Sequence, residues 1–265
     1  MYQFAYHRPA SLAEAEKLFS AAEDPKFLGG GQTLIPTLKQ RLASPSDLID
    51  LSGLKDLAGI SVSGGVVTIG AATRHADVAA SAEVRKAIPA LADLAGWIGD
   101  PAVRHRGTIG GSIANADPSA DYPAAIVALS ATVHTSRRAI AADDFFTGMF
   151  ETALHTGEIV TKVAFPVPEK AGYEKFRNPA SRYAMVGVFV AKTAGGVRVA
   201  VTGAGPSVFR QEAMEAALGR SFTPDAVAGI KVSPDGLNSD LHASAAYRAH
   251  LVTVMAKRAV ARAAG

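Results

Sequence analysis

The chain has 265 residues, a formal net charge of +3 from 27 Lys and Arg against 24 Asp and Glu, and 48% hydrophobic residues. This composition can bury a large core and argues against intrinsic disorder. The chain has no Cys, which excludes disulfides, thiolate zinc sites and iron–sulfur clusters carried by this chain. The longest apolar run, Tyr122–Val133, is too short to span a bilayer, and neither a signal peptide nor a basic stripe is evident, so we expect a soluble cytoplasmic protein with no membrane span and no nucleic-acid partner.

The first half of the chain mixes short helices and strands. Ser11 followed by Glu14 makes a capping box, which predicts that a helix begins there. Asp121 is placed to cap a later helix, and the residues before it, from Arg106 on, are rich in Gly, Ala, Asn and Asp and predict an irregular loop. The expected helices are 11–22, 37–42, 84–98 with a break at Pro89, and 122–129, and the expected strands are 26–28, 47–51 and 66–72.

Strands dominate the next part of the chain, and helices return at its end. Val197, Val199 and Val201 fall on one face of a strand. Helices and strands are mixed rather than strictly alternating, which favours an α+β fold over a doubly wound sheet. The expected strands are 131–135, 159–165, 173–176, 184–192 and 197–203, and the expected helices are 210–218, 224–228 and 243–263.

The common catalytic templates are absent from the sequence. No P-loop, GxSxG elbow or HExxH pair occurs. Gly203-Ala204-Gly205 has Val208 where the third Gly of a Rossmann fingerprint belongs, and it follows a late strand. We therefore predict neither catalytic side chains nor metal ligands.

Two glycine-rich segments remain as candidate ligand loops. Gly29–Leu34 follows an expected strand and reads Gly-Gly-Gly-Gln-Thr-Leu; such a turn lets the backbone approach a ligand and directs consecutive N–H groups at an anion. Gly107–Asp121 carries hydroxyl and amide groups every few positions. Its side chains are small, so the segment gains little stability from hydrophobic burial. A tight turn and a surface Ω-loop are the alternatives without a ligand. Together the loops suit a dinucleotide bound without a Rossmann fold.

The two loops, read together, resemble the FAD-binding medium subunits of molybdenum hydroxylases, a family that includes those of aerobic carbon monoxide dehydrogenase and xanthine dehydrogenase. The resemblance continues through Tyr6-His7-Arg8-Pro9, Gly70-Ala71-Ala72-Thr73-Arg74-His75, Tyr173-Glu174-Lys175-Phe176 and Val201-Thr202-Gly203-Ala204-Gly205-Pro206. It implies a vanillyl-alcohol-oxidase-like (PCMH-type) FAD-binding fold of two α/β subdomains, 1–55 and 56–170, and a C-terminal α/β domain, 171–265, with an antiparallel sheet and helices.

The resemblance also assigns residues to the cofactor. It implies that the pyrophosphate is held by Gly29, Gly30, Gly31, Gln32, Thr33 and Leu34 and by Thr108, Ile109, Gly110, Gly111 and Ser112, with Gly107 before them. It places Asn115 and Asp121 at the diphosphate–ribose portion or as braces of the loop, Thr73 and His75 at the adenosine or ribitol side, and Lys175 and Tyr183 near the isoalloxazine. We predict that replacing Gly30 or Gly110 by a bulky residue such as Val abolishes FAD retention and leaves the fold largely intact.

The implied role is electron transfer within a larger enzyme. An iron–sulfur small subunit with [2Fe-2S] clusters and a large subunit with the molybdopterin cofactor would be the partners, in a dimer of heterotrimers, and FAD here would pass electrons to NAD, a quinone or oxygen. Arg182 stands before Tyr183, where carbon monoxide dehydrogenases have an acidic residue, so carbon monoxide, N-heterocycles or purines, and aldehydes all stay open as substrates. A self-contained FAD-dependent oxidase or reductase, and a non-catalytic assembly protein of the same fold, are the alternative functions.

Overall fold

The computed structural model describes residues 1–264, and the chain forms separate sheets in sequence order. The first sheet is parallel, in the order β1-β3-β2, and α1 packs against it through Ala15 and Ile49. Ser11 caps α1 as predicted, accepting a hydrogen bond from the Glu14 N–H at 3.2 Å. The elements are β1 (Ala5–His7), α1 (Leu12–Ala21), β2 (Pro25–Leu28), α2 (Leu34–Lys39) and β3 (Asp47–Asp50), followed by 3₁₀ turns at Leu51–Gly53 and Lys55–Leu57.

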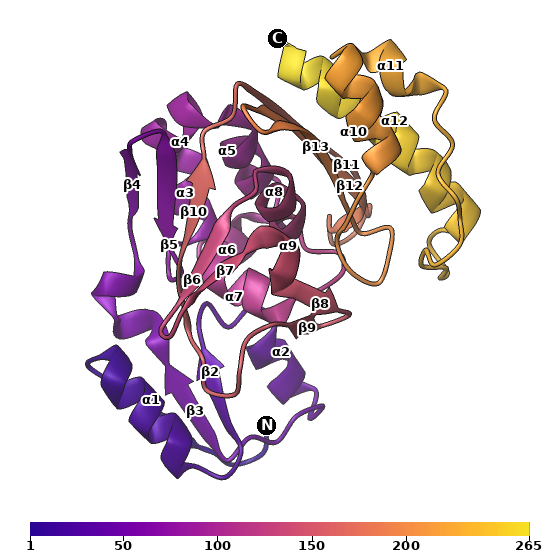
Figure 1. The fold of residues 1–265 in the computed structure, drawn as a ribbon. Helices are drawn as coiled ribbons and strands as arrows, with labels where there is room; N and C mark the ends of the chain where they lie inside the picture. The colour runs from indigo at the N-terminus through magenta and orange to yellow at the C-terminus, as the bar shows by residue number, and fades with distance from the viewer. Residues whose placement is uncertain (265) are drawn as a thin grey trace.

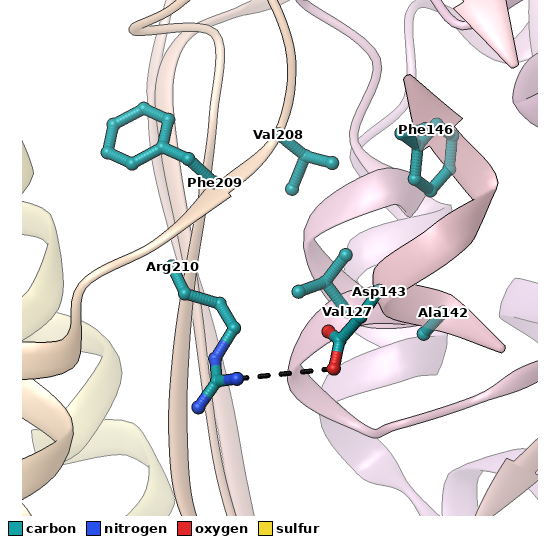
Figure 2. Close-up of a pocket in the computed structure, with 7 residues that line it drawn as sticks. All are labelled: Val127, Ala142, Asp143, Phe146, Val208, Phe209 and Arg210. Carbon is teal, nitrogen blue, oxygen red and sulfur yellow. Dashed lines mark ion pairs between the residues drawn. The ribbon is translucent and has the colours of Figure 1, made fainter. Parts of the chain in front are cut away.

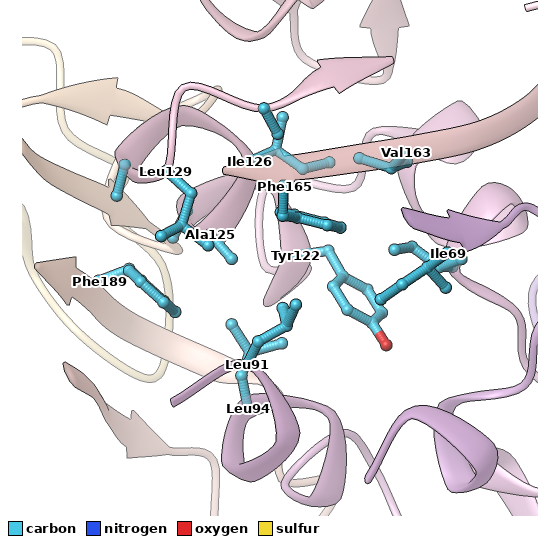
Figure 3. Packing of buried hydrophobic residues seen from close by; sticks show 14 of the residues in the cluster. Ile69, Leu91, Leu94, Tyr122, Ala125, Ile126, Leu129, Val163, Phe165 and Phe189 are labelled. Atoms are coloured by element: carbon cyan, nitrogen blue, oxygen red, sulfur yellow. The ribbon is translucent and has the colours of Figure 1, made fainter. Parts of the chain in front are cut away.

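The second sheet is antiparallel, in the order β4-β5-β10-β6-β7, with helices between its strands in the sequence. Figure 3 shows Tyr122 of α8, Leu91 of α5 and Phe165 of β10 directed into one buried cluster. The elements are β4 (Ile60–Ser63), β5 (Val66–Gly70), α3 (His75–Ala80), α4 (Ala82–Ala87), α5 (Pro89–Gly96), α6 (Pro101–Arg104), α7 (Ile109–Asn115), α8 (Tyr122–Ala128), β6 (Thr132–Thr135), β7 (Ala139–Ala141), α9 (Ala142–Phe145), β8 (Phe146–Gly148), β9 (Glu151–Thr152) and β10 (Val160–Pro166).

The third sheet, β11-β12-β13-β14, is antiparallel and lies between two layers of helices (Figure 1). Alternate residues of β12 serve different cores: Val188 packs with α12, whereas Phe189 joins the cluster beneath α5 and α8. Burial on both faces explains why this strand is almost continuously apolar. The elements are β11 (Lys170–Arg177), β12 (Ala184–Thr193), β13 (Gly196–Thr202), β14 (Phe209–Arg210), α10 (Glu212–Arg220), α11 (Pro224–Ala228) and α12 (Ala245–Ala264).

Three local predictions are wrong. The segment from Arg106 to Asp121 is not irregular throughout, because it contains α7, whose N-cap is Thr108. The poor helix propensity of adjacent glycines is outweighed by this cap and by burial of Ile109 and Ile113. The helix expected at 37–42 begins at Leu34 and ends at Lys39. Asp121 does not cap α8: its backbone is helical and its carboxylate has other partners.

Candidate functional site

The two glycine loops meet in space, and Gly30 shows how closely. A Cβ added to Gly30 would lie 2.0 Å from the carbonyl oxygen of Arg106 and 2.7 Å from the Cα of Gly107. A Cβ on Gly29 would face the Thr108 hydroxyl at 3.3 Å. The backbone of the first loop therefore packs directly on the start of the second, and only glycine allows that approach.

The first loop offers unpaired backbone donors. Gly31 has a φ of +73° and its carbonyl closes the following turn, accepting from the N–H of Ile35 at 3.1 Å. Within residues 1–264, the N–H groups from Gly30 to Thr33 donate to no protein acceptor. The side chains of Gln32 and Thr33 are exposed. Consecutive unpaired N–H groups beside exposed polar side chains are suited to an anionic ligand.

The second loop is different, because most of its donors are used within the protein. The N–H of Ile109 donates to the carbonyl of Thr73 at 3.1 Å, and that of Gly110 donates to the carbonyl of Ala71 at 2.8 Å. A Cβ on Gly110 would lie 2.5 Å from the Ala71 methyl. Ile109 and Gly110 thus join α7 to the segment that follows β5. A larger side chain at Gly30 or Gly110 would disturb this packing, so the geometry argues against the expectation that the fold stays largely intact.

The groups of the second loop that a ligand can reach belong to the residues on either side of Ile109 and Gly110. The Thr108 hydroxyl accepts from the Gly111 N–H at 3.2 Å, so its own proton remains free to donate. A Cβ on Gly111 would approach only that hydroxyl, at 3.1 Å. Ser112 and Asn115 are partly exposed along the same helix. These residues, rather than Ile109 and Gly110, present hydrogen-bonding groups at the surface of the loop.

Thr73 and His75 lie behind the second loop. The Thr73 hydroxyl bonds the backbone of Gly59, so this side chain fixes a neighbouring turn. His75 is buried, its Nε2 would meet a Cβ on Gly107 at 2.6 Å, and its Nδ1 has no partner within residues 1–264. Burial, together with the charge of Arg104, lowers the pKa of His75 to about 4. The imidazole is therefore neutral at physiological pH and supports Gly107 from below.

Asp121 and Lys175 form a buried ion pair at the end of the second loop. Lys175 Nζ lies 2.8 Å from Asp121 Oδ1, and the Tyr173 hydroxyl donates to the same oxygen at 2.5 Å. Burial raises the pKa of Asp121, and the charge of Lys175 offsets this only in part. The loop thus ends on side chains of β11, and Asp121 braces it there.

Tyr183 lies apart from these groups, in the turn between β11 and β12. Its hydroxyl accepts from Asn178 Nδ2 at 3.3 Å, and its ring meets that of His242 edge-on at 6.3 Å. No hydrogen bond or ring contact within residues 1–264 joins Tyr183 to either glycine loop. Arg182, beside it, is exposed and has a φ of +65°.

A separate cavity of about 290 Å³ lies between α8, α9 and β14. Figure 2 shows Phe146, Val208 and Phe209 on its walls and Arg210 directed at Asp143, 4.0 Å away. Arg210 also pairs with Glu215 at 2.5 Å, and Asp143 pairs with Arg198. The charges of the cavity are neutralised within the protein, and it is not part of the glycine-loop site.

The groups without protein partners fit a dinucleotide cofactor. They are the N–H groups from Gly30 to Thr33 and the hydroxyls of Thr108 and Ser112. Donors dominate this set, as the phosphates of FAD require. In contrast, residues 1–264 hold no group of three His, Asp or Glu side chains arranged for a metal. No helix in the same range is long and apolar enough to cross a membrane.

Sequence reasoning gave no role to Thr202 and Tyr173, which hold the second loop from the C-terminal side. Thr202 is fully buried, and its hydroxyl reaches the carbonyls of Pro118 and Ala120 at 3.0 and 2.6 Å. The available signal in the sequence was a polar residue, Thr202, at the end of an alternating strand and directly before a glycine. That signal indicates a tertiary hydrogen bond but does not name its partner.

Comparison with known proteins agrees with this geometry. Residues 2–168 match the family described as the FAD binding domain in molybdopterin dehydrogenase. The chain is 35% identical to the carbon monoxide dehydrogenase medium chain of Hydrogenophaga pseudoflava, covering 97% of this chain and 96% of that protein. It is 36% identical to the glyceraldehyde dehydrogenase medium chain of Sulfolobus acidocaldarius, covering 97% of each. A solved carbon monoxide dehydrogenase chain of Oligotropha carboxidovorans superimposes with a TM-score of 0.91 at 33% identity, covering 98% of this chain and 97% of that one.

Proposed function

Since the chain belongs to the family of FAD-binding subunits of molybdenum hydroxylases, we propose that it is the electron-transfer subunit of such an enzyme. It would receive electrons from the [2Fe-2S] clusters of a partner subunit and release them to an external acceptor. FAD, when bound, supplies the capacity to take up and give back those electrons. The observation that carries the proposal is the meeting of the two glycine loops around a set of unpaired donors.

The chain's own residues bind and orient the cofactor. The N–H groups from Gly30 to Thr33 are placed to hold the pyrophosphate, with hydroxyl protons from Thr108 and Ser112 beside them. Asn115 would serve the diphosphate–ribose portion. The neutral His75 would support the second loop from behind. Such a site requires neither a nucleophile nor a general base from this chain, because the substrate is oxidised elsewhere in the enzyme.

The remaining assignments from the resemblance place Lys175 and Tyr183 near the isoalloxazine. Lys175 is tied to Asp121 at the end of the second loop, which supports a position beside the cofactor rather than at the outer surface. Tyr183 lies in a surface turn next to the exposed Arg182. We propose that this turn lies at the acceptor side of the flavin.

The partners are an iron–sulfur small subunit and a molybdenum-binding large subunit, in a dimer of heterotrimers. Iron–sulfur clusters are held by Cys thiolates, and this chain has none. We propose a three-domain division at 1–55, 56–170 and 171–265, supported by the three main sheets, which lie within residues 5–50, 60–166 and 170–210. A cytoplasmic location is part of the same proposal.

The substrate and acceptor belong to the assembled enzyme. Relatives of nearly equal identity are named for carbon monoxide and for glyceraldehyde, so overall similarity does not select between them. Carbon monoxide, aldehydes and N-heterocycles or purines are the substrate classes to test, with NAD, a quinone or oxygen as acceptor.

The experiment is gentle purification of the tagged chain from its own organism. Flavin absorbance with iron–sulfur bands and two co-purifying subunits is the expected result, with FAD identified after heat release. Each substrate class is then added anaerobically, and bleaching of the flavin band identifies the reductant. A flavin-containing chain without partners, reduced by its own substrate, would instead indicate a self-contained oxidase or reductase. Failure of the assembled complex to bind added FAD would indicate a non-catalytic assembly protein.

A further inference from the structure

The turn that follows α7, residues 116–121, is held from outside its own subdomain. Within the turn, the Asp117 carbonyl accepts from the N–H of Ala120 at 2.9 Å and the Asp117 carboxylate accepts from that of Ser119 at 2.8 Å. Ala116 has a left-handed φ of +46°. The two internal hydrogen bonds leave the carbonyls of Pro118 and Ala120 without a donor from within the turn, and Ala116 is strained.

Two residues at the end of β13 supply the missing constraint. The hydroxyl of Thr202 lies 3.0 Å from the carbonyl oxygen of Pro118 and 2.6 Å from that of Ala120. The N–H of Gly203 donates to the same Pro118 oxygen at 2.8 Å. The carbonyls of Pro118 and Ala120, on either side of Ser119, thus depend on donors more than 80 residues away in the sequence.

Gly203 is itself fixed from behind. Its φ is +81°, and a Cβ there would lie 2.3 Å from the carbonyl of Ala184. Its carbonyl accepts from the buried Arg248 of α12 at 3.1 Å, and Arg248 also binds the Met185 carbonyl at 2.6 Å. The donors that reach Pro118 therefore stand on a rigid base in the C-terminal part of the chain.

We propose that Thr202 and Gly203 are positioning residues of the cofactor site. They fix the turn 116–121 and, through it, α7, on which Ser112 and Asn115 present their polar groups. FAD binding then depends on residues beyond 168, where the match to the FAD-binding family ends. This inference rests on the proposed function, since it assumes that FAD occupies the glycine loops.

The test compares full-length variants, each freed of flavin and titrated with FAD. Thr202→Val removes the hydroxyl and keeps the shape, and Thr202→Ser restores the hydroxyl. Thr253→Val is the matched control, because the Thr253 hydroxyl makes the same kind of bond, to the carbonyl of Ile230 at 2.9 Å, on a surface away from the turn. Each variant is measured for FAD dissociation constant, thermal midpoint of the flavin-free form and circular dichroism of the bound flavin.

We expect Thr202→Val to weaken FAD binding about tenfold, or about 1.4 kcal/mol, and to change the dichroism of the flavin that still binds. The FAD dissociation constants of Thr202→Ser and Thr253→Val should both stay within about twofold of the parent value, a change in binding free energy less than half of that for a tenfold change. Tyr173→Phe provides a second variant, because it removes the bond to Asp121 at the end of the same turn; it should also weaken FAD binding.

Parental FAD affinity in both Thr202→Val and Tyr173→Phe, with only the thermal midpoints lowered, would show that these residues stabilise the fold and do not position the site. Equal weakening by Thr253→Val would show the same. If the parent chain in its assembled complex binds no FAD, the proposed function fails, and this result is distinct from a parent that binds FAD and variants that bind it equally well.

Discussion

Comparing Gly30→Ala with Gly111→Ala distinguishes a glycine that is needed for packing from one that is needed for ligand access. The added Cβ would lie 2.0 Å from the Arg106 carbonyl oxygen and 2.7 Å from Gly107 Cα. Both are backbone atoms, which cannot rotate away as a side chain would, so the two loops must separate. Overpacking of this kind costs about 1–3 kcal/mol, and backbone contacts favour the upper half of that range.

The matched control is Gly111→Ala. Its Cβ would approach only the Thr108 hydroxyl, at 3.1 Å, and Gly111 lies in the first turn of α7. Replacing a helical Gly by Ala stabilises by up to about 1 kcal/mol where space allows. We therefore expect the flavin-free form of Gly111→Ala to be as stable as the parent or slightly more stable, while its methyl group narrows the ligand surface and weakens FAD binding.

Thermal unfolding followed by far-ultraviolet circular dichroism, with and without FAD, measures both effects. A loss of 2–3 kcal/mol should lower the midpoint of Gly30→Ala by roughly 4–12 °C, because each 1 kcal/mol moves a domain of this size by about 2–4 °C. FAD affinity should fall as well, since the first loop moves with Gly30. A Gly30→Ala chain with the parental midpoint and parental FAD affinity would refute the close packing of the two loops.

Further predictions concern buried charges, each measured by urea unfolding across pH. Burial raises the pKa of Glu158, but hydrogen bonds, led by the one from Arg138, outweigh burial and lower the pKa from 4.5 to about 2. The contribution of Glu158 to the free energy of unfolding should therefore be full above pH 4.5 and be lost as the pH falls toward 2. Glu158→Gln should remove this pH dependence and cost about 1–3 kcal/mol at neutral pH, a range that allows for the partly exposed Arg138. The pKa of His75 is lowered from 6.5 to about 4, so the free energy of unfolding should fall by up to about 3 kcal/mol as the pH falls from 6.5 to 4, and this decrease should be absent in His75→Leu. The same dependence of unfolding free energy on pH in His75→Leu and the parent would contradict the burial of the ring. Asp121→Asn leaves Lys175 buried without its counter-charge and should cost about 3–5 kcal/mol, whereas adding Lys175→Met should recover part of this; equal losses in the single and double variants would argue against the pair.

The helix and strand pattern predicted the α+β class, the resemblance to a known family implied the FAD-binding fold, and the comparisons confirm both. The prediction of the class rests on strong local signals. The capping box at Ser11 starts α1, and the alternation of Val197, Val199 and Val201 forms β13. The glycine loops were evident as unusual clusters, because small residues in such numbers contribute little to a core. These signals depend on a residue and its near neighbours, and a single sequence contains them in full.

The sequence does not distinguish a glycine that is needed for packing from one that is needed for access to a ligand. Gly30 and Gly111 are both glycines in small-residue loops, yet a Cβ on Gly30 would meet the backbone of the other loop, whereas a Cβ on Gly111 would meet only the hydroxyl of Thr108 in its own loop. Likewise, Asp121 precedes a helix as a cap would, but its carboxylate goes to Tyr173 and Lys175 of a distant strand. Only the tertiary structure decided these roles. Contacts between residues far apart in the chain depend on how sheets and helices pack, and a hydrogen bond or a clash is set by shifts of about an ångström that no local pattern encodes.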